Sequence, residues 1–243
     1  MDEIARIVSA VKNEGRRNLF EHEAFRILHV YGILTPPHEV AKSPDDASVS
    51  AKRIGYPVAM KIVSPDILHK TEAAGVILGI SDEAALRTGF RQIIANAKRM
   101  NPQCRIEGII VEGMIPQGTE IIVGALRDEQ FGPSVMFGLG GVLAELVKDV
   151  SFRVAPISRF DAEDLVDDLR FSAILKGFRG RPRPDREAIV DILLKTCRMI
   201  LDAPEIESLD LNPVVVHEKG ATAVDARVLL ADSSPLTCRW SVE

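Results

Sequence analysis

A carboxylate and an amide lie close together in the run DLNP at residues 210–213. Side chains alternate across an extended segment, so Asp210 and Asn212 would project from the same face. Residues 217–220 have the composition of a hairpin turn, and a strand pair across it would bring Asn212 beside Asp225. Mg²⁺ takes such oxygen ligands and fills its shell with water and phosphate. The pattern predicts a magnesium site at Asn212 and Asp225, while a turn Asn before Pro and a solvent-facing Asp fit the same spacing.

A lysine interrupts the apolar strand predicted over residues 57–63. An ammonium group in such a run costs desolvation free energy unless Lys61 lies on an exposed face or meets an anion. A phosphate oxygen is a suitable anion, which makes Lys61 a candidate phosphate-binding residue. An outward-facing lysine on an edge strand is the alternative interpretation.

His69 stands in a polar stretch, residues 64–74, that has neither helical nor strand periodicity. A loop histidine can present a ring nitrogen, and neutral imidazole is a nucleophile near pH 7 because its unperturbed pKa is about 6.5. His69 is therefore a candidate phosphoryl carrier, and Lys70 beside it would offset phosphate charge. A surface histidine without a chemical role is the alternative.

A glycine-rich turn, FGLGG at residues 137–141, follows a predicted strand. Glycines let backbone N–H groups approach phosphate oxygens, so Gly140 and Gly141 are candidate phosphate contacts, although any tight turn uses glycine in the same way. Arg153, in a short strand downstream, would add a cation to the same site. Leu143 stands where a dinucleotide fingerprint needs a small residue, and no GxxxxGK[ST] loop or HExxH zinc signature occurs.

The segment EGM at residues 112–114 ends one predicted strand, and Glu120 opens the next. A hinge between two lobes at this point would offer backbone groups of Glu112 and Met114 to an adenine ring. Glu120 would meet a ribose hydroxyl or a basic partner. These three residues are candidate nucleotide contacts by position alone.

Predicted helices and strands alternate over the first hundred residues, and antiparallel hairpins dominate afterwards. The helices are predicted over residues 19–30, 43–54, 81–100, 161–169 and 184–201, and the strands over residues 39–41, 57–63, 76–80, 105–112, 119–127, 134–137, 206–216 and 221–230. This mixture favours an α+β fold of two lobes over a doubly wound sheet. We expect an N-terminal extension (1–17), a first lobe (18–110), a second lobe with the metal-binding hairpin (111–231) and a C-terminal tail (232–243).

The 243-residue chain carries a net charge of −5, with acidic and basic residues interspersed, so nucleic acid is not an expected partner. No run approaches the roughly 18 apolar residues of a membrane span, and the first residues lack the apolar core of a secretory signal. The three cysteines, Cys104, Cys197 and Cys238, form no CxxC pair and indicate free thiols in a reducing compartment. We therefore expect a cytoplasmic protein.

Several of these runs occur together in a characteristic order. Lys61 in its strand, SPDILHKTEA at residues 64–73, EGM, FGLGG and ESLDLNPV at residues 207–214 follow one another along the chain. In this order they resemble the β subunit of the ADP-forming (NDP-forming) acyl-CoA synthetases, of which acetyl-CoA synthetase is the familiar member. The resemblance extends over about residues 18–230.

The resemblance implies an ATP-grasp fold, in which two α+β lobes hold the nucleotide between them, as in succinyl-CoA synthetase. It implies that His69 is the β-subunit histidine that is transiently phosphorylated before transfer to ADP. It also assigns ligand roles by position: Lys61 to the nucleotide phosphates, Glu112 and Met114 to the adenine hinge, Glu120 to an acidic nucleotide contact, and Asn212 and Asp225 to Mg²⁺. Gly140, Gly141 and Arg153 complete the expected ATP/ADP-binding set.

The resemblance also implies a partner, because in this family an α subunit or a fused α region binds CoA and carries another phosphohistidine. This chain has no room for that region, so we expect a hetero-oligomer, an α₂β₂ assembly. The implied reaction is acyl-CoA + phosphate + ADP giving acid + CoA + ATP. Two alternatives stay open: a single-chain ATP-grasp carboxylate ligase, which acts through an acyl phosphate without His69, and a non-catalytic ATP-binding module.

The sequence departs from the family pattern in the histidine loop. The family run commonly reads His-Lys-Thr/Ser-x-x-Gly-Gly-Val, whereas Ala74 stands here in place of the first glycine. Alanine tolerates most backbone conformations except positive φ. If the family loop needs positive φ at this position, we expect the loop to be shaped differently here.

Overall fold

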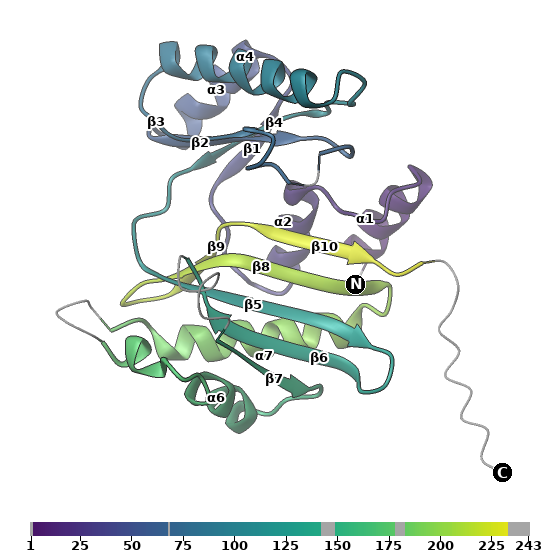
Figure 1. Cartoon of the computed structure of the whole chain (residues 1–243), viewed down its shortest axis with the longest axis vertical. Coiled ribbons are helices and arrows are strands. Elements are labelled where there is room, and N and C mark those ends of the chain that lie inside the picture. Colours follow the sequence, from purple (N-terminus) through teal and green to yellow (C-terminus); the bar gives the residue numbers. More distant parts are fainter. Residues whose placement is uncertain (1, 68, 142–148, 178–182, 233–243) are drawn as a thin grey trace.

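The computed structural model describes residues 2–67, 69–141, 149–177 and 183–232. Figure 1 shows two β-sheets one above the other, with helices above the smaller sheet, along the larger sheet and at the level between the two. The smaller sheet has the strand order β1-β4-β2-β3, and all its neighbours are antiparallel. Its strands are β1 (His38–Ala41), β2 (Val58–Val63), β3 (Val76–Ile80) and β4 (Gly108–Gly113). Helices α3 (Pro44–Ile54) and α4 (Glu83–Met100) cover its outer face.

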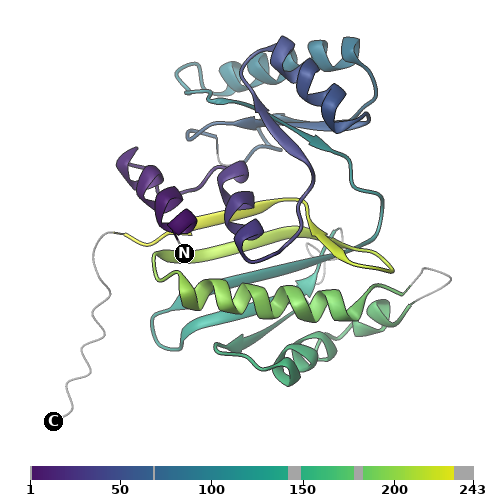
Figure 2. The same cartoon turned by 180° about the vertical axis from the view of Figure 1, so that it is seen from behind.

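The larger sheet has the order β10-β8-β5-β6-β7, with β9 paired to β8, and is also antiparallel. Its strands are β5 (Thr119–Asp128), β6 (Gly132–Leu139), β7 (Val150–Val154), β8 (Ile206–Val216), β9 (Ala221–Ala223) and β10 (Ala226–Leu230). Helices α6 (Arg159–Asp167) and α7 (Arg186–Asp202) lie across one face of it, as the view from behind shows (Figure 2). A short 3₁₀ helix (Ser172–Lys176) follows α6.

Strand alternation assigns the side chains of β2 to two different cores. Met60 and Ile62 point toward α4 and belong to the small-sheet core, whereas Val63 packs with the core of the large sheet. Lys61 lies on the same face as Val63. The inner face of the small sheet is therefore turned toward the large sheet, and Lys61 projects into the seam between them.

The N-terminal helices α1 (Asp2–Asn13) and α2 (Glu21–Val30) complete the large-sheet core instead of the small one. The buried face of α2 is apolar at helical spacing, and Phe25 and Leu28 are fully buried there. The expected first lobe (18–110) thus contains a helix that packs with the other sheet. The change of sheet also falls later than expected, in residues 114–118, because β4 continues to Gly113.

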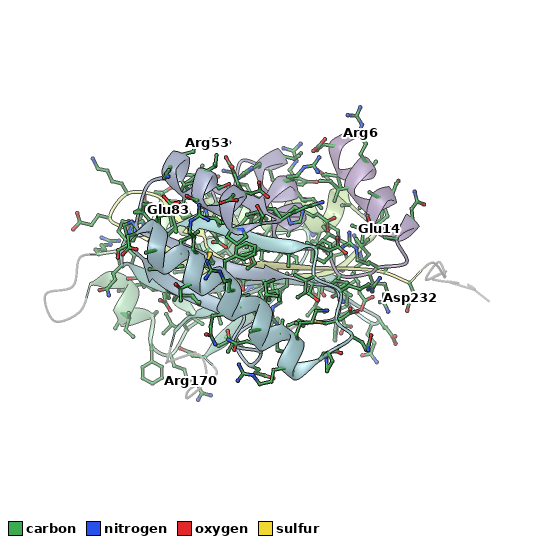
Figure 3. All side chains as sticks on the ribbon, turned by 90° about the horizontal axis from the view of Figure 1, so that it is seen from above. Arg6, Glu14, Arg53, Glu83, Arg170 and Asp232 are labelled. Atoms are coloured by element: carbon green, nitrogen blue, oxygen red, sulfur yellow. The ribbon has the colours of Figure 1, made fainter. Side chains whose placement is uncertain are left out.

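Most expected elements are present within a few residues of their expected bounds, including the turn at 217–220, where the His217 N–H donates to the Gly220 carbonyl at 3.0 Å. The single strand expected over residues 221–230 is divided into β9 and β10. Charged side chains such as Arg6, Glu14 and Asp232 lie toward the periphery in the view from above (Figure 3). Within the described residues, no helix has the length and apolarity to cross a membrane.

Candidate functional site

A buried ion cluster lies at the seam between the two sheets. The Lys61 ammonium lies 2.6 Å from a Glu21 carboxylate oxygen and 2.9 Å from a Glu112 oxygen, and it donates a hydrogen bond to the Val224 carbonyl at 2.9 Å. All three charged residues are at most 6% exposed. Burial lowers the pKa of Lys61, but the carboxylates of Glu21 and Glu112 outweigh it and raise the pKa overall. Lys61 is therefore not an outward-facing lysine. Its ammonium group is already paired with two anions of the protein, Glu21 and Glu112.

Glu112 lies in this cluster and not at a solvent-facing hinge. Burial raises its pKa to about 8, the negative charge of Glu21 adds to the rise, and Lys61 opposes it. Met114, two residues on, is partly exposed, and its N–H donates to the Pro57 carbonyl at 3.2 Å. Met114 thus begins the linker between the sheets, as expected for a hinge, while the Glu112 side chain points to Lys61.

A second lysine connects the cluster to the histidine loop. The Lys70 ammonium pairs with the other oxygen of Glu21 and lies 3.6 Å from an Asp225 oxygen. Burial raises the pKa of Asp225, but Lys70 and Lys61 outweigh it, so the pKa is lowered and Asp225 stays ionised. Glu21, at the start of α2, therefore holds both lysines through its two oxygens.

The expected hairpin is present, and it brings the backbones of Asn212 and Asp225 together. The Asn212 N–H donates to the Asp225 carbonyl at 3.2 Å, and Arg227 lies opposite Asp210 in the register of β10 and β8. Burial raises the pKa of Asp210, with Arg227 opposing. Asn212, in β8, offers an amide oxygen, and Asp225, between β9 and β10, offers a carboxylate. No group of three or more metal-ligating His, Cys, Asp or Glu occurs in the described ranges, and Mg²⁺, which keeps waters and phosphate ligands, fits a two-residue donor set.

His69 lies on the loop between β2 and β3 and opens to solvent. Its side chain is 62% exposed, and its Nδ1 lies 3.8 Å from a Glu72 oxygen. The backbone fixes the loop around it: the Ala73 N–H donates to the His69 carbonyl at 3.2 Å, and the Gly75 N–H donates to the Lys70 carbonyl at 2.8 Å. His69 and Lys70 line a cavity of about 460 Å³ together with residues of β10. The imidazole is accessible, and the cation beside it is anchored.

Ala74 adopts φ +46°, and it is the only non-glycine with positive φ among the described residues. The loop therefore keeps the left-handed backbone that the family glycine would favour and is not reshaped around the alanine. The Asn96 side-chain amide donates to the Ala74 carbonyl at 2.9 Å, which ties the loop to α4. The expectation of a differently shaped loop is not met at this position.

We expect Ala74→Gly to stabilise the protein slightly. A left-handed alanine costs about 1–2 kcal/mol, while glycine costs about 0.4–1 kcal/mol through the entropy of the unfolded chain. The net gain is about 0.5 kcal/mol, measurable by thermal unfolding as a rise of about 1–2 °C. Ala95→Gly, on the exposed side of helix α4, is the control and should lose about 1 kcal/mol. Equal losses in both variants would contradict the strained conformation.

The glycine turn packs against the start of β5. The Gly140 N–H donates to the Glu120 carbonyl at 2.8 Å, and a Cβ added at Gly140 would lie 2.9 Å from the Glu120 carbonyl carbon. Gly141 has φ +65°, and a Cβ there would lie 2.7 Å from a Glu120 carboxylate oxygen. The approach to backbone requires glycine at Gly140, and the positive φ favours it at Gly141. The structure thus brings Glu120, Gly140 and Gly141 together, while Leu143 lies outside the described residues.

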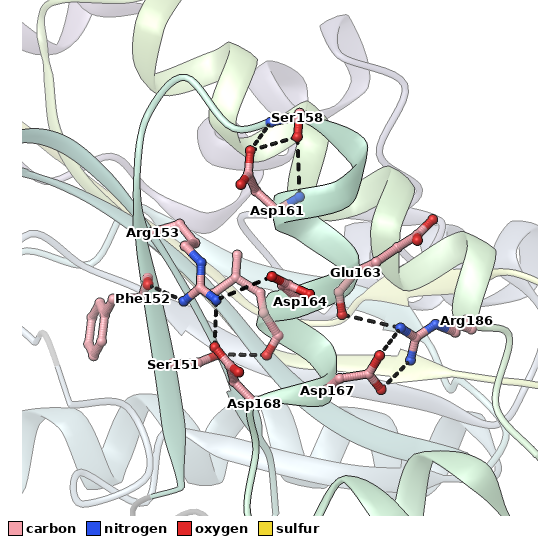
Figure 4. A network of polar contacts seen from close by, with 11 residues as sticks. Ser151, Phe152, Arg153, Ser158, Asp161, Glu163, Asp164, Asp167, Asp168 and Arg186 are labelled. Atoms are coloured by element: carbon pink, nitrogen blue, oxygen red, sulfur yellow. Dashed lines mark hydrogen bonds and ion pairs between the residues drawn. The ribbon is translucent and has the colours of Figure 1, made fainter.

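Arg153 does not join these residues. Its guanidinium pairs with Asp168 at 2.5 Å and lies 4.0 Å from Asp164, both toward helix α6 (Figure 4). In the strand register Arg153 lies opposite Val135, whose side chain is buried in the helix-covered core. Residues directly opposite each other in an antiparallel pair share a sheet face, so Arg153 lies on the helix-covered face of the sheet with Val135. The expectation that it adds a cation to the nucleotide site is therefore corrected by the structure.

Two charged residues of this region were not predicted. Glu21 is the first residue of a helix, where an acidic side chain is common because it favours the helix dipole, so its type gives no further signal. Arg227 lies in β10 opposite Asp210, so the two side chains share one face of the sheet. The alternation rule that placed Asn212 beside Asp225 would also have found Arg227.

A family model described as an ATP-grasp domain matches residues 10–230. The sequence is 45% identical over 233 residues to the β subunit of acetate–CoA ligase (ADP-forming) I of Pyrococcus furiosus, and the match covers 95% of this chain and 100% of the relative. These matches span both sheets and the ion cluster.

The structure is similar to that of dinucleotide-forming acetyl-coenzyme A synthetase 1 of Candidatus Korarchaeum cryptofilum, in complex with coenzyme A, Ca-AMPCP and HgCl⁺. The TM-score is 0.91 at 45% identity, over 93% of this chain and 99% of that one. A second structure of that protein holds coenzyme A and Mg-AMPPCP, with a phosphohistidine segment pointing towards the nucleotide binding site. It matches with a TM-score of 0.83 at 40% identity, over 94% of this chain and 100% of that one.

Proposed function

The chain belongs to the ATP-grasp family, among the β subunits of ADP-forming acetate–CoA ligases, and from this membership we propose that it passes a phosphoryl group from His69 to ADP. The overall reaction is acyl-CoA + phosphate + ADP giving acid + CoA + ATP. One observation carries this proposal. The exposed imidazole of His69 is followed along the chain by Lys70, whose ammonium group lies 3.6 Å from the carboxylate of Asp225.

The transfer breaks one bond and forms one. A β-phosphate oxygen of ADP attacks the phosphorus carried on the His69 ring, the N–P bond breaks, and its electron pair returns to the imidazole nitrogen. Lys70 offsets phosphate charge beside that nitrogen. Asn212 and Asp225 would hold Mg²⁺, which neutralises nucleotide phosphate charge when it is bound.

The nucleotide would lie between the sheets, against the cluster and the linker. We assign the adenine to the linker at Glu112 and Met114, and the phosphates to the side of Lys61. Glu120, Gly140 and Gly141, which pack together at the start of β5, form the neighbouring contact. CoA and the acyl group would be bound by an α subunit, and the two kinds of subunit would form an α₂β₂ assembly.

The test measures ATP formed from acetyl-CoA, phosphate, ADP and Mg²⁺, with and without the α subunit. We expect ATP only when the α subunit is present and none with His69→Ala. A His69→Ala protein that binds ADP like the wild type and makes no ATP supports the histidine relay. Undiminished ATP formation in this variant would remove His69 from the mechanism and favour direct transfer from an acyl phosphate.

The Asp225→Asn variant tests the metal hairpin. Losing one anionic oxygen ligand should raise the half-saturating Mg²⁺ concentration at least about tenfold, equivalent to about 1.4 kcal/mol. The titration is followed by ATP formation at saturating ADP. Asp45→Asn, which removes an exposed carboxylate of α3 paired with Arg87, is the control and should leave the Mg²⁺ dependence unchanged. An unchanged Mg²⁺ dependence in Asp225→Asn would rule out its role as a ligand.

A further inference from the structure

The cavity beside His69 is rich in positive charge. Its lining contains basic side chains from the segment before α2, the histidine loop, the segment before β4, and β10: Arg16, Arg17, His69, Lys70, Arg105 and Arg227. A cavity of about 460 Å³ with such a lining suits an anionic group.

Most of these cations are already neutralised by the protein. Within the described residues the ion pairs are Arg16 with Glu14 and Glu23, Arg17 with Glu207 and Asp232, Lys70 with Glu21 and Asp225, and Arg105 with Asp66. Most of their positive charge is therefore paired with carboxylates of the cavity wall. An anion entering the cavity would compete with these carboxylates for them.

Arg227 differs from the others. It is exposed, and it makes no ion pair with any carboxylate in the part of the chain that the structure describes. It is the second residue of β10, and Asp225 lies just before that strand, in the break that separates it from β9. Asp210 lies opposite it in the strand register, so the two side chains share one sheet face. Arg227 thus lines the cavity of His69 close to Asp225 along the chain, and its guanidinium is held in no ion pair within the described residues.

We propose that Arg227 binds the phosphoryl group carried on His69 and holds it during transfer to the nucleotide. This role rests on the proposed function. A guanidinium donates two parallel N–H groups to two oxygens of a phosphoryl group, which fixes its orientation as well as its charge. In the transfer the N–P bond of His69 breaks while the bond to the ADP oxygen forms, and the negative charge stays on the three phosphoryl oxygens. Arg227 stabilises that charge at a point that the paired lysines do not cover.

The experiment measures phosphohistidine formed on the full chain, with the α subunit present, from γ-labelled ATP and Mg²⁺ in single turnovers. We expect Arg227→Gln to slow phosphorylation of His69 about a hundredfold or more at saturating ATP. The Kd for ATP should stay within about threefold of the wild type, because the nucleotide contacts are elsewhere. Arg105→Gln, which removes a cavity cation already paired with Asp66, is the matched control and should phosphorylate at the wild-type rate.

Two further variants separate a chemical role from a structural one. Arg227→Ala should regain at least about tenfold in rate when guanidinium ion is added at low concentration, whereas His69→Ala should regain none. Arg227→Lys keeps the charge without the planar fork and should be intermediate. If Arg227→Gln fails to fold, the lysine variant and its rate decide the question.

The outcomes distinguish this role from the function on which it rests. Phosphohistidine formed at the wild-type rate in Arg227→Gln would overturn the role of Arg227 alone. A loss of rate that follows entirely from weaker ATP binding would overturn it too, and would assign Arg227 to the nucleotide. No phosphohistidine in the wild-type complex would overturn the proposed function together with this role.

Discussion

Replacing Glu21 by Gln is expected to lower the free energy of unfolding by about 3 kcal/mol. Removing one partner of a buried ion pair costs about 3–5 kcal/mol, because it leaves an uncompensated charge. Glu21 pairs with both Lys61 and Lys70. We place the loss at the lower end, because Glu112 still faces Lys61. Denaturant unfolding, monitored at neutral pH, measures the difference.

The same variant should change the ionisation of its neighbour. The negative charge of Glu21 is the second cause, after burial, of the raised pKa of Glu112. Without that charge the pKa of Glu112 should fall, so that Glu112 takes over the pairing of Lys61. Glu3→Gln, which breaks an exposed pair with Arg26, is the control and should cost at most about 1 kcal/mol. Similar small losses in both variants would contradict the role of Glu21 as a buried anchor.

The Glu21 change should also impair phosphoryl transfer. Lys70 would lose its closest anion, and the Lys70 ammonium would no longer be held beside His69 and Asp225. A protein that is destabilised but folded at 25 °C should therefore show a reduced rate of His69 phosphorylation at saturating ATP. A folded Glu21→Gln protein with the wild-type rate would limit Glu21 to a structural role.

Glu112→Gln is expected to remove a pH dependence of stability. The pKa of Glu112 is raised from 4.5 to about 8 in the folded protein. Between these values the folded state holds a proton that the unfolded state has released, so the stabilisation is complete below about pH 4.5 and is lost as the pH rises through 8. The wild type should therefore lose stability relative to the variant over this interval, by a few kcal/mol in order of magnitude.

The measurement is the free energy of unfolding of both proteins at intervals from pH 5 to 8.5, without nucleotide. Histidines with lowered pKa values, such as His22 and His29, titrate in both proteins and cancel in the difference. Asp225, whose pKa is lowered, loses its stabilising charge only as the pH falls below its ordinary range near 3.8, which lies outside the interval. A difference between the two proteins that does not vary with pH would show that Glu112 is ionised throughout.

The α+β class, the ATP-grasp fold and the resemblance to the ADP-forming synthetase β subunit, all expected from sequence, are confirmed. Strand periodicity placed Asn212 beside Asp225, whose backbones are joined by a hydrogen bond, because a hairpin is a local structure. Arg153 was expected in a strand, and it lies in one. The face to which it points depends on register, and a shift of one residue reverses it.

The buried ion cluster was beyond the reach of local patterns. Lys61 was identified as an anomaly in a strand, but its anions come from the start of α2 and from β4. Glu21 is separated from Lys61 by 40 residues, and only the packing of α2 onto the large sheet brings them together. The position of α2 also explains why the expected first lobe, which begins at residue 18, does not match the hydrophobic cores: α2 lies within it but packs in the core of the large sheet.

The charges of the ion cluster nearly cancel near neutral pH. The two lysines are balanced by Glu21 and Asp225, and Glu112, with a pKa of about 8, is mostly protonated there. The cluster itself exerts little attraction at a distance, so it should contribute little to the ionic-strength dependence of the association rate of a magnesium-bound nucleotide. The nucleotide would then be selected after the first encounter, when its phosphates compete with Glu21 and Asp225 for the two lysines.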